Sequence, residues 1–469
     1  MNANTQFTAI SRPNPKELDY EITEIEGEIP KELHGALYRN GPNQNVLPKE
    51  GEQAMAFFEG DGMVRRVSFS EGKAHFQSAH VHSPSFRLEA EKGVYCMGGS
   101  NLAPNETLDE PMERVLANTN IVAHAGKLLA MAENSRPYAL NMQSLATEGE
   151  WDFNGDLIGP WTTAHPKLDA KTGQMVLHGY STQSPYLQFY VIENDGKVSV
   201  AEPVDAPWPS LFHDLAITEN FAAIPLGSAV YNPTIAEGNT KQVWDCLELD
   251  PSLNMRFGLR RREANAETLW CETPTPGNIF HVGNAYEKSN KIILDACTFK
   301  TPNVLQQVPT LRKTGLANVF NANLYLYEIN PTTGETIETQ LSDIPIEFPR
   351  IDDRFVGYEN RYVFATTGDG GSDASGSLRR VSRFDFHTNE FNHADSVDGR
   401  WTSEPVFVPR SDDAEEGCGY ILAYIFDANR DATGVEIRDA ENVDQAPLAT
   451  LWLNHRMPFD FHGNWVAAA

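Results

Sequence analysis

Histidines with a shared local setting are the residues of this chain that point most directly to chemistry. The chain has 13 histidines, and three follow an aromatic residue beside a β-rich run, in Phe212-His213-Asp214, Phe280-His281-Val282-Gly283 and Phe461-His462-Gly463-Asn464. A fourth, His165 in Thr163-Ala164-His165-Pro166, stands beside a hairpin without the aromatic. Because neutral imidazole is a common ligand of transition metals, these four histidines are candidate ligands of one metal ion.

The same pattern also fits ordinary structural histidines, so it leaves the metal interpretation open. A lone histidine is more often satisfied by a hydrogen bond than by a metal. Phe386-His387 repeats the aromatic-histidine pair, but Thr388-Asn389 follows at once and indicates an exposed hairpin tip. We assign structural roles to the remaining histidines, which are His34, His75, His80, His82, His124, His178, His393 and His455.

The elements that must position these histidines are short β-rich runs joined by turns. Val64 to Phe69 returns after Glu71-Gly72, Tyr190 to Glu193 after Asp195-Gly196, and Leu324 to Ile329 after Thr333-Gly334. Asp169 to Gly173 begins another such turn. Repeated hairpins without a sustained helical period predict an all-β fold.

A β-propeller is the architecture that this hairpin rhythm favours, because radial repetition protects sheet edges. Strands of different blades converge on its axis, so distant histidines could meet there. The rhythm alone does not fix the number of blades. Loop or helical insertions are expected at Met112 to Val122 and Val304 to Phe320, where alternation breaks down. No linker separates domains, so we expect one domain over residues 1–469.

Composition restricts the partners and the compartment. The formal net charge of -28 argues by repulsion against nucleic acid and against an anionic membrane surface. Met1 to Pro13 lacks a basic segment followed by an apolar core, and no later stretch is apolar for the length that a bilayer requires, which predicts a cytoplasmic protein. Five cysteines without CxxC spacing indicate reduced core residues.

Six ordered motifs resemble those of the carotenoid cleavage oxygenases. They are Arg39-Asn40-Gly41-Pro42-Asn43, Phe58-Glu59-Gly60-Asp61-Gly62-Met63, Ala164-His165-Pro166-Lys167, Phe212-His213-Asp214, Phe280-His281-Val282-Gly283-Asn284-Ala285 and Phe461-His462-Gly463-Asn464-Trp465. The resemblance runs from about Gly27 to the end of the sequence. It implies a seven-bladed propeller with insertions over the active-site face and non-haem iron(II) on the axis, held by His165, His213, His281 and His462.

The resemblance also implies residues around the iron. Three glutamates match the family's hydrogen-bond partners of the iron ligands: Glu133, Glu347 and Glu404. Without the resemblance, each would be interpreted as a surface carboxylate or a local salt bridge. Thr119 resembles the position whose methyl group crowds an open coordination site, and a turn-forming role in Asn118-Thr119-Asn120 is an equal alternative.

The activity implied is cleavage of a C=C double bond in a hydrophobic substrate with O2, giving two carbonyl products. Ala132 precedes Glu133 where stilbene-cleaving members usually carry Lys, which favours a carotenoid or apocarotenoid. A stilbene or phenylpropanoid alkene remains the alternative. Val304 to Phe320 is a candidate membrane contact at a tunnel mouth, although the negative charge weakens it. Two remoter alternatives are a calcium-dependent propeller hydrolase and a non-catalytic interaction platform.

Overall fold

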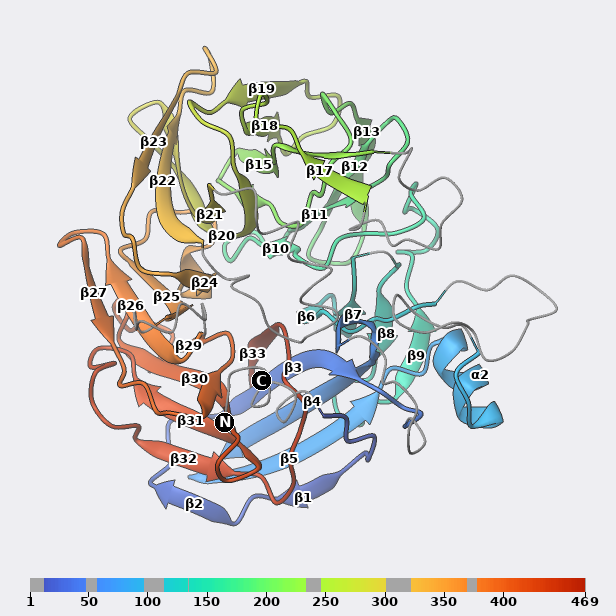
Figure 1. Cartoon of the computed structure of the whole chain (residues 1–469), viewed down its shortest axis with the longest axis vertical. Helices are drawn as coiled ribbons and strands as arrows, with labels where there is room; N and C mark the ends of the chain where they lie inside the picture. Colours follow the sequence, from blue (N-terminus) through green and yellow to red (C-terminus); the bar gives the residue numbers. More distant parts are fainter. Residues whose placement is uncertain are drawn as a thin grey trace.

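Seven β-sheets surround a central axis in the computed structural model of the chain (Figure 1). The structure describes residues 12–47, 57–96, 114–133, 135–232, 246–300, 322–368 and 378–468. Within these ranges, seven sheets have four or more strands, and β16 (Ala229–Tyr231) and β17 (Leu247–Leu249) form one further pair. The predicted all-β, seven-bladed propeller is confirmed.

Five blades are built from strands that follow one another along the chain, with β16 and β17 inserted in one of them. Their strands, in order, are β6 (Asn120–His124), β7 (Lys127–Met131), β8 (Tyr138–Leu140) and β9 (Thr147–Glu150); β10 (Lys167–Leu168), β11 (Met175–Tyr180), β12 (Leu187–Ile192) and β13 (Val198–Val204); β14 (Ala216–Ile217), β15 (Phe221–Leu226), β18 (Arg256–Arg261) and β19 (Thr268–Glu272); β20 (Asn278–Lys288), β21 (Lys291–Phe299), β22 (Asn323–Ile329) and β23 (Thr336–Gln340); β24 (Ile346–Arg350), β25 (Tyr362–Thr367), β26 (Arg380–Asp385) and β27 (Glu390–His393).

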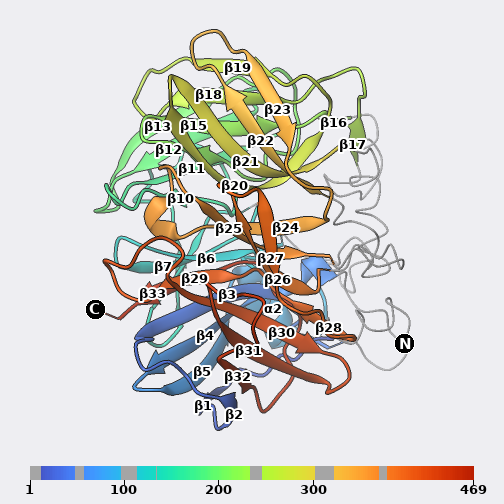
Figure 2. The same ribbon diagram turned by 90° about the vertical axis from the view of Figure 1, so that its left-hand side faces the viewer.

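Two blades combine strands from opposite ends of the sequence and so close the ring. One has the order β1 (Asp19–Glu21), β5 (Lys73–His80), β4 (Asp61–Ser70), β3 (Gly35–Asn43) and β33 (Gly463–Ala467). The other has β2 (Glu24–Gly27), β32 (Ala449–Trp452), β31 (Ala432–Asp439), β30 (Gly419–Asp427) and β28 (Arg400–Thr402), and β29 (Val406–Pro409) also pairs with β30. Figures 1 and 2 both show β33 beside β3.

Packing between blades follows from the alternation of side chains along the strands. In β5, every second residue from Ala74 to His80 is buried. Leu37, Val67 and Phe76 of one closing blade share a core cluster with Leu422 and Val435 of the other. The strands nearest the axis contact their counterparts in neighbouring blades, as β33 does with β6 and β20 with β24. Residues at the ends of these inner strands therefore converge on the axis.

The predicted hairpins are confirmed, and one predicted insertion is placed differently. The turns at Glu71-Gly72, Asp195-Gly196 and Thr333-Gly334 each join paired strands of one blade. The residues from Asn120 onward belong to strand β6, so the break expected at Met112 to Val122 ends earlier. The chain between β5 and β6 contains the α-helix α2 (Pro84–Lys92), which lies at the periphery of the ring in Figure 1. Its buried residues are Ser85, Phe86 and Glu89, and a single buried apolar side chain gives no helical period in the sequence. Two short 3-10 helices are η1 (Phe57–Glu59) and η3 (Asp353–Phe355).

Two further predictions concern the surface and the cysteines. Val304 to Phe320, the candidate membrane contact, lies outside the described residues. In the part of the chain that the structure describes, no helix has the length and apolarity needed to span a bilayer. All five cysteines are described and none of them forms a disulfide, and four are buried as predicted, whereas Cys418 is half-buried.

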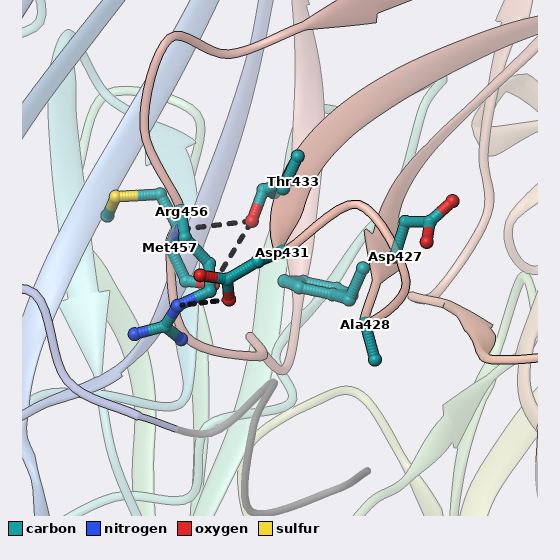
Figure 3. Close-up of a pocket in the computed structure, with 8 residues that line it drawn as sticks. Asp427, Ala428, Asp431, Thr433, Arg456 and Met457 are labelled. Atoms are coloured by element: carbon teal, nitrogen blue, oxygen red, sulfur yellow. Dashed lines mark hydrogen bonds and ion pairs between the residues drawn. The ribbon is translucent and has the colours of Figure 1, made fainter. Parts of the chain in front are cut away.

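The segment that leads into β33 is fixed to the β30–β31 turn, as Figure 3 shows. Thr433 Oγ1 accepts a hydrogen bond from the Met457 backbone N–H at 2.9 Å and donates to the Met457 carbonyl at 3.1 Å. Arg456 Nε lies 3.5 Å from Asp431 Oδ1. The hollow that these residues line leaves no space for a water molecule, so it is a packing feature and not a ligand site. The contacts determine where the chain reaches Asp460 and His462.

Candidate metal centre

The four predicted histidines stand at the axial ends of inner strands from four blades. His165 lies two residues before the start of β10, His213 lies three residues before β14, and His462 directly precedes β33. His281 lies within β20, where the pairing register with β21 shifts between Ile279 and Val282. That bulge turns the local backbone and re-aims the side chain, which is a common use of bulges near functional sites.

The four imidazoles form one group. One ring nitrogen from each lies within 4.8 Å of those of the other three. The His165 ring centroid is 4.4 Å from that of His213 and 4.5 Å from that of His462. Residues separated by almost 300 positions in the sequence thus meet at a single point. This four-histidine group can bind a metal ion.

The ring nitrogens that face each other have the protonation state of ligands. Nδ1 of His281 donates to Glu347 Oε2 at 2.5 Å, and Nδ1 of His462 donates to Glu404 Oε1 at 2.9 Å. Nδ1 of His213 is hydrogen-bonded to Glu133 Oε1. In a neutral ring the other nitrogen, Nε2, then carries a lone pair. Each of the three predicted glutamates is therefore paired with one of the predicted histidines.

Lone pairs that converge in this way call for a cation. Nε2 of His213 lies 3.2 Å from Nε2 of His281, yet neither nitrogen carries a proton when both rings are neutral, so the contact is repulsive. Nε2 of His165 is buried with no hydrogen-bond partner among the described residues. A transition metal resolves both problems, and four imidazole nitrogens suit iron, zinc, copper or nickel better than calcium or magnesium, which prefer oxygen.

Burial favours the neutral form for three of the four rings. Burial and the neighbouring histidines hold the pKa of His165 well below its usual value. Burial, followed by His213, lowers the pKa of His281 to about 3. For His462, burial outweighs Glu404 and lowers the pKa to about 4. Burial also lowers the pKa of His213, but Glu133 and its hydrogen bond more than compensate, so this pKa is raised.

The three glutamates are held by different partners. Glu404 also accepts hydrogen bonds from Arg39 Nη1 at 2.9 Å and the Gly463 backbone N–H at 3.0 Å, and Arg350 Nη1 lies 3.2 Å away. Burial alone would raise the pKa of Glu404, but Arg350, His462 and Arg39 hold it far below its usual value. Glu404 therefore remains a carboxylate.

Within the described ranges, no arginine is hydrogen-bonded to Glu347 or Glu133. Glu347 Oε2 accepts from the Phe348 backbone N–H at 3.0 Å, while its Oε1 is buried without a partner among the described residues. Burial raises the pKa of Glu347 to about 8. Glu133 accepts a hydrogen bond from the Tyr180 hydroxyl at 3.2 Å. Burial and Glu133 hold the pKa of Tyr180 well above its usual value, so its hydroxyl stays a donor.

Two phenylalanine rings lie next to the histidines. The Phe280 ring is 5.4 Å from that of His213, and the Phe348 ring is 5.2 Å from that of His281 and 5.5 Å from that of His462. Phe348 has a φ of 55°, which is rare for a bulky residue and marks local strain. Strain at a residue between Glu347 and Pro349 indicates a backbone adapted to place this ring at the site.

Thr119 and His387, two other residues discussed from the sequence, lie next to the histidine group and away from it, respectively. The Thr119 carbonyl accepts the His462 backbone N–H at 3.1 Å, so Thr119 lies next to the group, while the role of its methyl group stays a prediction. His387 is exposed in the β26–β27 turn, as expected of a hairpin tip. Arg39, Arg350 and Tyr180 were missed as members of the site. Arg39 stands in the motif Arg39–Asn43 and Arg350 lies three residues after Glu347, whereas no pattern in the sequence marked Tyr180.

Comparison with known proteins places this site in a family. The family model described as retinal pigment epithelial membrane protein (RPE65) matches residues 11–467. The chain belongs to this family, the carotenoid cleavage oxygenases. This oxygenase is 31% identical to carotenoid 9,10(9′,10′)-cleavage dioxygenase 1 of Pisum sativum, over 94% of its own chain and 86% of that protein. It is 30% identical to isoeugenol monooxygenase of Pseudomonas nitroreducens, over 98% of both chains.

A solved structure adds evidence on metals. Cobalt-substituted apocarotenoid oxygenase of Synechocystis superposes with a TM-score of 0.88 at 26% identity, over 99% of both chains. As a carotenoid cleavage oxygenase, the present protein is an alkene-cleaving dioxygenase that acts on a hydrophobic small molecule. The alternatives of a calcium-dependent hydrolase and of a non-catalytic platform are thereby set aside.

Proposed function

We propose that this oxygenase binds iron(II) through His165, His213, His281 and His462 and uses it to cleave a C=C bond of a carotenoid or apocarotenoid. The observation that carries the proposal is the convergence of four imidazoles, with one ring nitrogen of each within 4.8 Å of those of the other three and with Nδ1 of three of them hydrogen-bonded to glutamates. Four neutral imidazoles leave the double positive charge of iron(II) uncompensated. Buried carboxylates nearby then become favourable.

Iron(II), when bound, would supply the activation of O2 that no side chain provides. The protein's own residues do the rest. Glu133, Glu347 and Glu404 each accept the outer N–H of one imidazole, which fixes its tautomer and orientation and strengthens its donor nitrogen. Thr119 is proposed to crowd one open position with its methyl group. The overall reaction adds both atoms of O2 across the double bond and yields two carbonyl compounds.

The surroundings of the histidines support an apolar substrate. Phe280 and Phe348 place apolar rings against the imidazoles, which excludes water and offers contact to a polyene. Ala132, 2% exposed, supplies a small apolar side chain beside Glu133. The Tyr180 hydroxyl is already engaged with Glu133, so it is not a ready partner for a phenol. These features favour a carotenoid or apocarotenoid.

A phenolic alkene is the second candidate. It is favoured by the similarity to isoeugenol monooxygenase, which extends over 98% of both chains. This candidate requires a phenol-binding side chain other than Ala132 or Tyr180.

The test combines metal analysis with substrate comparison. Purified protein is expected to contain about one iron per chain, and His281→Ala should contain little, while His387→Ala matches the wild type. Iron-loaded enzyme is then incubated separately with an apocarotenal and a 4-hydroxystilbene, and carbonyl products are identified. Iron at wild-type level in His281→Ala contradicts the ligand set, and efficient cleavage of the stilbene alone replaces the carotenoid proposal by the second candidate.

A further inference from the structure

The chain segments that carry three of the four histidines meet at one buried carboxylate, that of Asp214. Lys167 Nζ lies 2.8 Å from Asp214 Oδ1. The backbone N–H of Val282 donates to Asp214 Oδ2 at 2.9 Å. Lys167 follows His165 by two residues, Asp214 follows His213 by one, and Val282 follows His281 by one. The three segments come from different blades and are linked through two oxygen atoms.

Because the Asp214 carboxylate is buried, its stability depends on the ion pair with Lys167. The Asp214 side chain is 2% exposed and that of Lys167 is 21% exposed. A carboxylate removed from water to this degree is costly unless a cation and hydrogen-bond donors surround it. The Leu215 backbone N–H supplies a further donor to Oδ1 at 2.7 Å. With Lys167 in place, Asp214 can hold Val282 in a fixed position, and hence the neighbouring His281.

The fourth histidine is held independently. His462 is fixed by Glu404, which is bonded to Arg39 and Gly463. Asp460, two residues before His462, forms ion pairs with Arg39 and Arg65 at 2.9 and 3.3 Å. The histidine group therefore consists of one set of three tied through Asp214 and one member tied through buried arginines.

We propose that Lys167 and Asp214 are positioning residues that set the relative placement of His165, His213 and His281 and so determine the coordination geometry of the metal. The inference rests on the proposed metal site and goes beyond it, because neither side chain is a ligand or a hydrogen-bond partner of an imidazole. It differs from a general stabilising salt bridge in one respect. Removing the pair changes the metal's environment and not only the stability of the fold.

A matched control is available elsewhere in the propeller. Lys300 Nζ lies 2.8 Å from Glu338 Oε2, and the Lys300 side chain is 22% exposed, so distance and exposure match those of Lys167. This pair links Lys300, which follows β21, to Glu338 of β23, in the blade whose strand β20 carries His281, and neither residue adjoins a histidine of the group. Lys300→Met removes an ion pair of the same length, together with a hydrogen bond to Thr275, without changing a residue next to those histidines.

The experiment loads metal-free protein with cobalt(II), whose ligand-field absorption reports the number and arrangement of its donors. Lys167→Met is expected to change the band positions and intensities and to weaken cobalt binding by roughly 10–100-fold, the usual effect of losing support for a ligand. Lys167→Arg, which keeps the cation, should restore most of the wild-type spectrum. Lys300→Met should leave spectrum and affinity unchanged. Thermal unfolding of each metal-free variant is measured alongside.

The outcomes separate this inference from the proposed function. Wild-type protein that binds no cobalt overturns the metal site and this inference together. Wild-type protein that binds cobalt, with an unchanged spectrum in folded Lys167→Met, overturns this inference alone. If Lys167→Met does not fold because Asp214 is left without its cation, the charge-neutral double variant Lys167→Met/Asp214→Asn is used. A wild-type cobalt spectrum in that variant also overturns the inference.

Discussion

Replacing Glu347 by glutamine is expected to weaken the metal site while stabilising the metal-free fold at alkaline pH. Burial raises the pKa of Glu347 from 4.5 to about 8, so the ionised carboxylate costs the metal-free folded protein about 5 kcal/mol above pH 8. The sign follows from linkage. Because the folded-state pKa is the higher one, the stability is fully present below pH 4.5 and is lost as the pH rises through 8.

Glutamine removes that pH-dependent loss but adds a smaller, constant cost. Its amide oxygen can accept the bonds that Glu347 Oε2 receives from His281 and Phe348. Its NH2 group would take the place of Oε1, which has no partner, and a buried unpaired donor costs about 1–3 kcal/mol. Metal-free Glu347→Gln should thus be less stable than the wild type at pH 4.5 and more stable by about 2–4 kcal/mol above pH 8.

The assay is denaturant unfolding of both proteins with chelator at several pH values, followed by iron binding and turnover on the same preparations. Loss of the negative charge beside His281 should reduce metal affinity or turnover by about 10–100-fold. Glu404→Gln is the control, because it removes the buried carboxylate that Arg39 and Arg350 share and should be less stable at every pH. A Glu347→Gln variant that is less stable than the wild type at pH 8 refutes this reasoning.

Three other predictions test the site and its surroundings. His281→Ala should lose metal and activity, whereas His387→Ala should be silent, as measured by iron content and product formation. Burial lowers the pKa of His178 to about 4, so its contribution to stability is present above pH 6.5 and falls by about 2 kcal/mol by pH 5, and His178→Gln should show a correspondingly shallower loss on acidification. Gly463→Ala would place a Cβ 2.1 Å from the Tyr38 carbonyl oxygen, which should destabilise the protein by about 1–3 kcal/mol in denaturant unfolding.

The four candidate ligand histidines and the three glutamates were predictable because they resemble positions in the family's motifs, whereas the sequence did not show which glutamate pairs with which histidine. Period-2 alternation and turns at Glu71-Gly72 and Thr333-Gly334 predict hairpins from local chemistry alone. The resemblance, and not the pattern, separated His281 from His387. The pairing of Glu347 with His281 spans 66 positions and depends on which blades adjoin, so no local signal marks it.

The ion pair and the backbone conformation beside the histidines could not be predicted for a related physical reason. Lys167 and Asp214 stand inside recognised motifs, yet their ion pair is a contact between blades that the sequence does not order in space. The positive φ of Phe348 contradicts the conformational preference of an aromatic residue, so no pattern in the sequence indicated it. Tertiary packing overrides that preference, and sequence reasoning based on preferences misses it.

The closure of the ring by β33 has a consequence for biogenesis. On the ribosome, His281 is made 181 residues before His462, and at about 5–20 residues per second the nascent chain waits roughly 9–36 s between them. During that interval the growing polypeptide exposes three histidines of the group without the fourth. The group of four histidines is assembled only when β33 pairs with β3, because His462 directly precedes β33. A chain arrested before this point can carry at most three of the four candidate ligands, so the proposed metal site cannot be complete before β33 is in place.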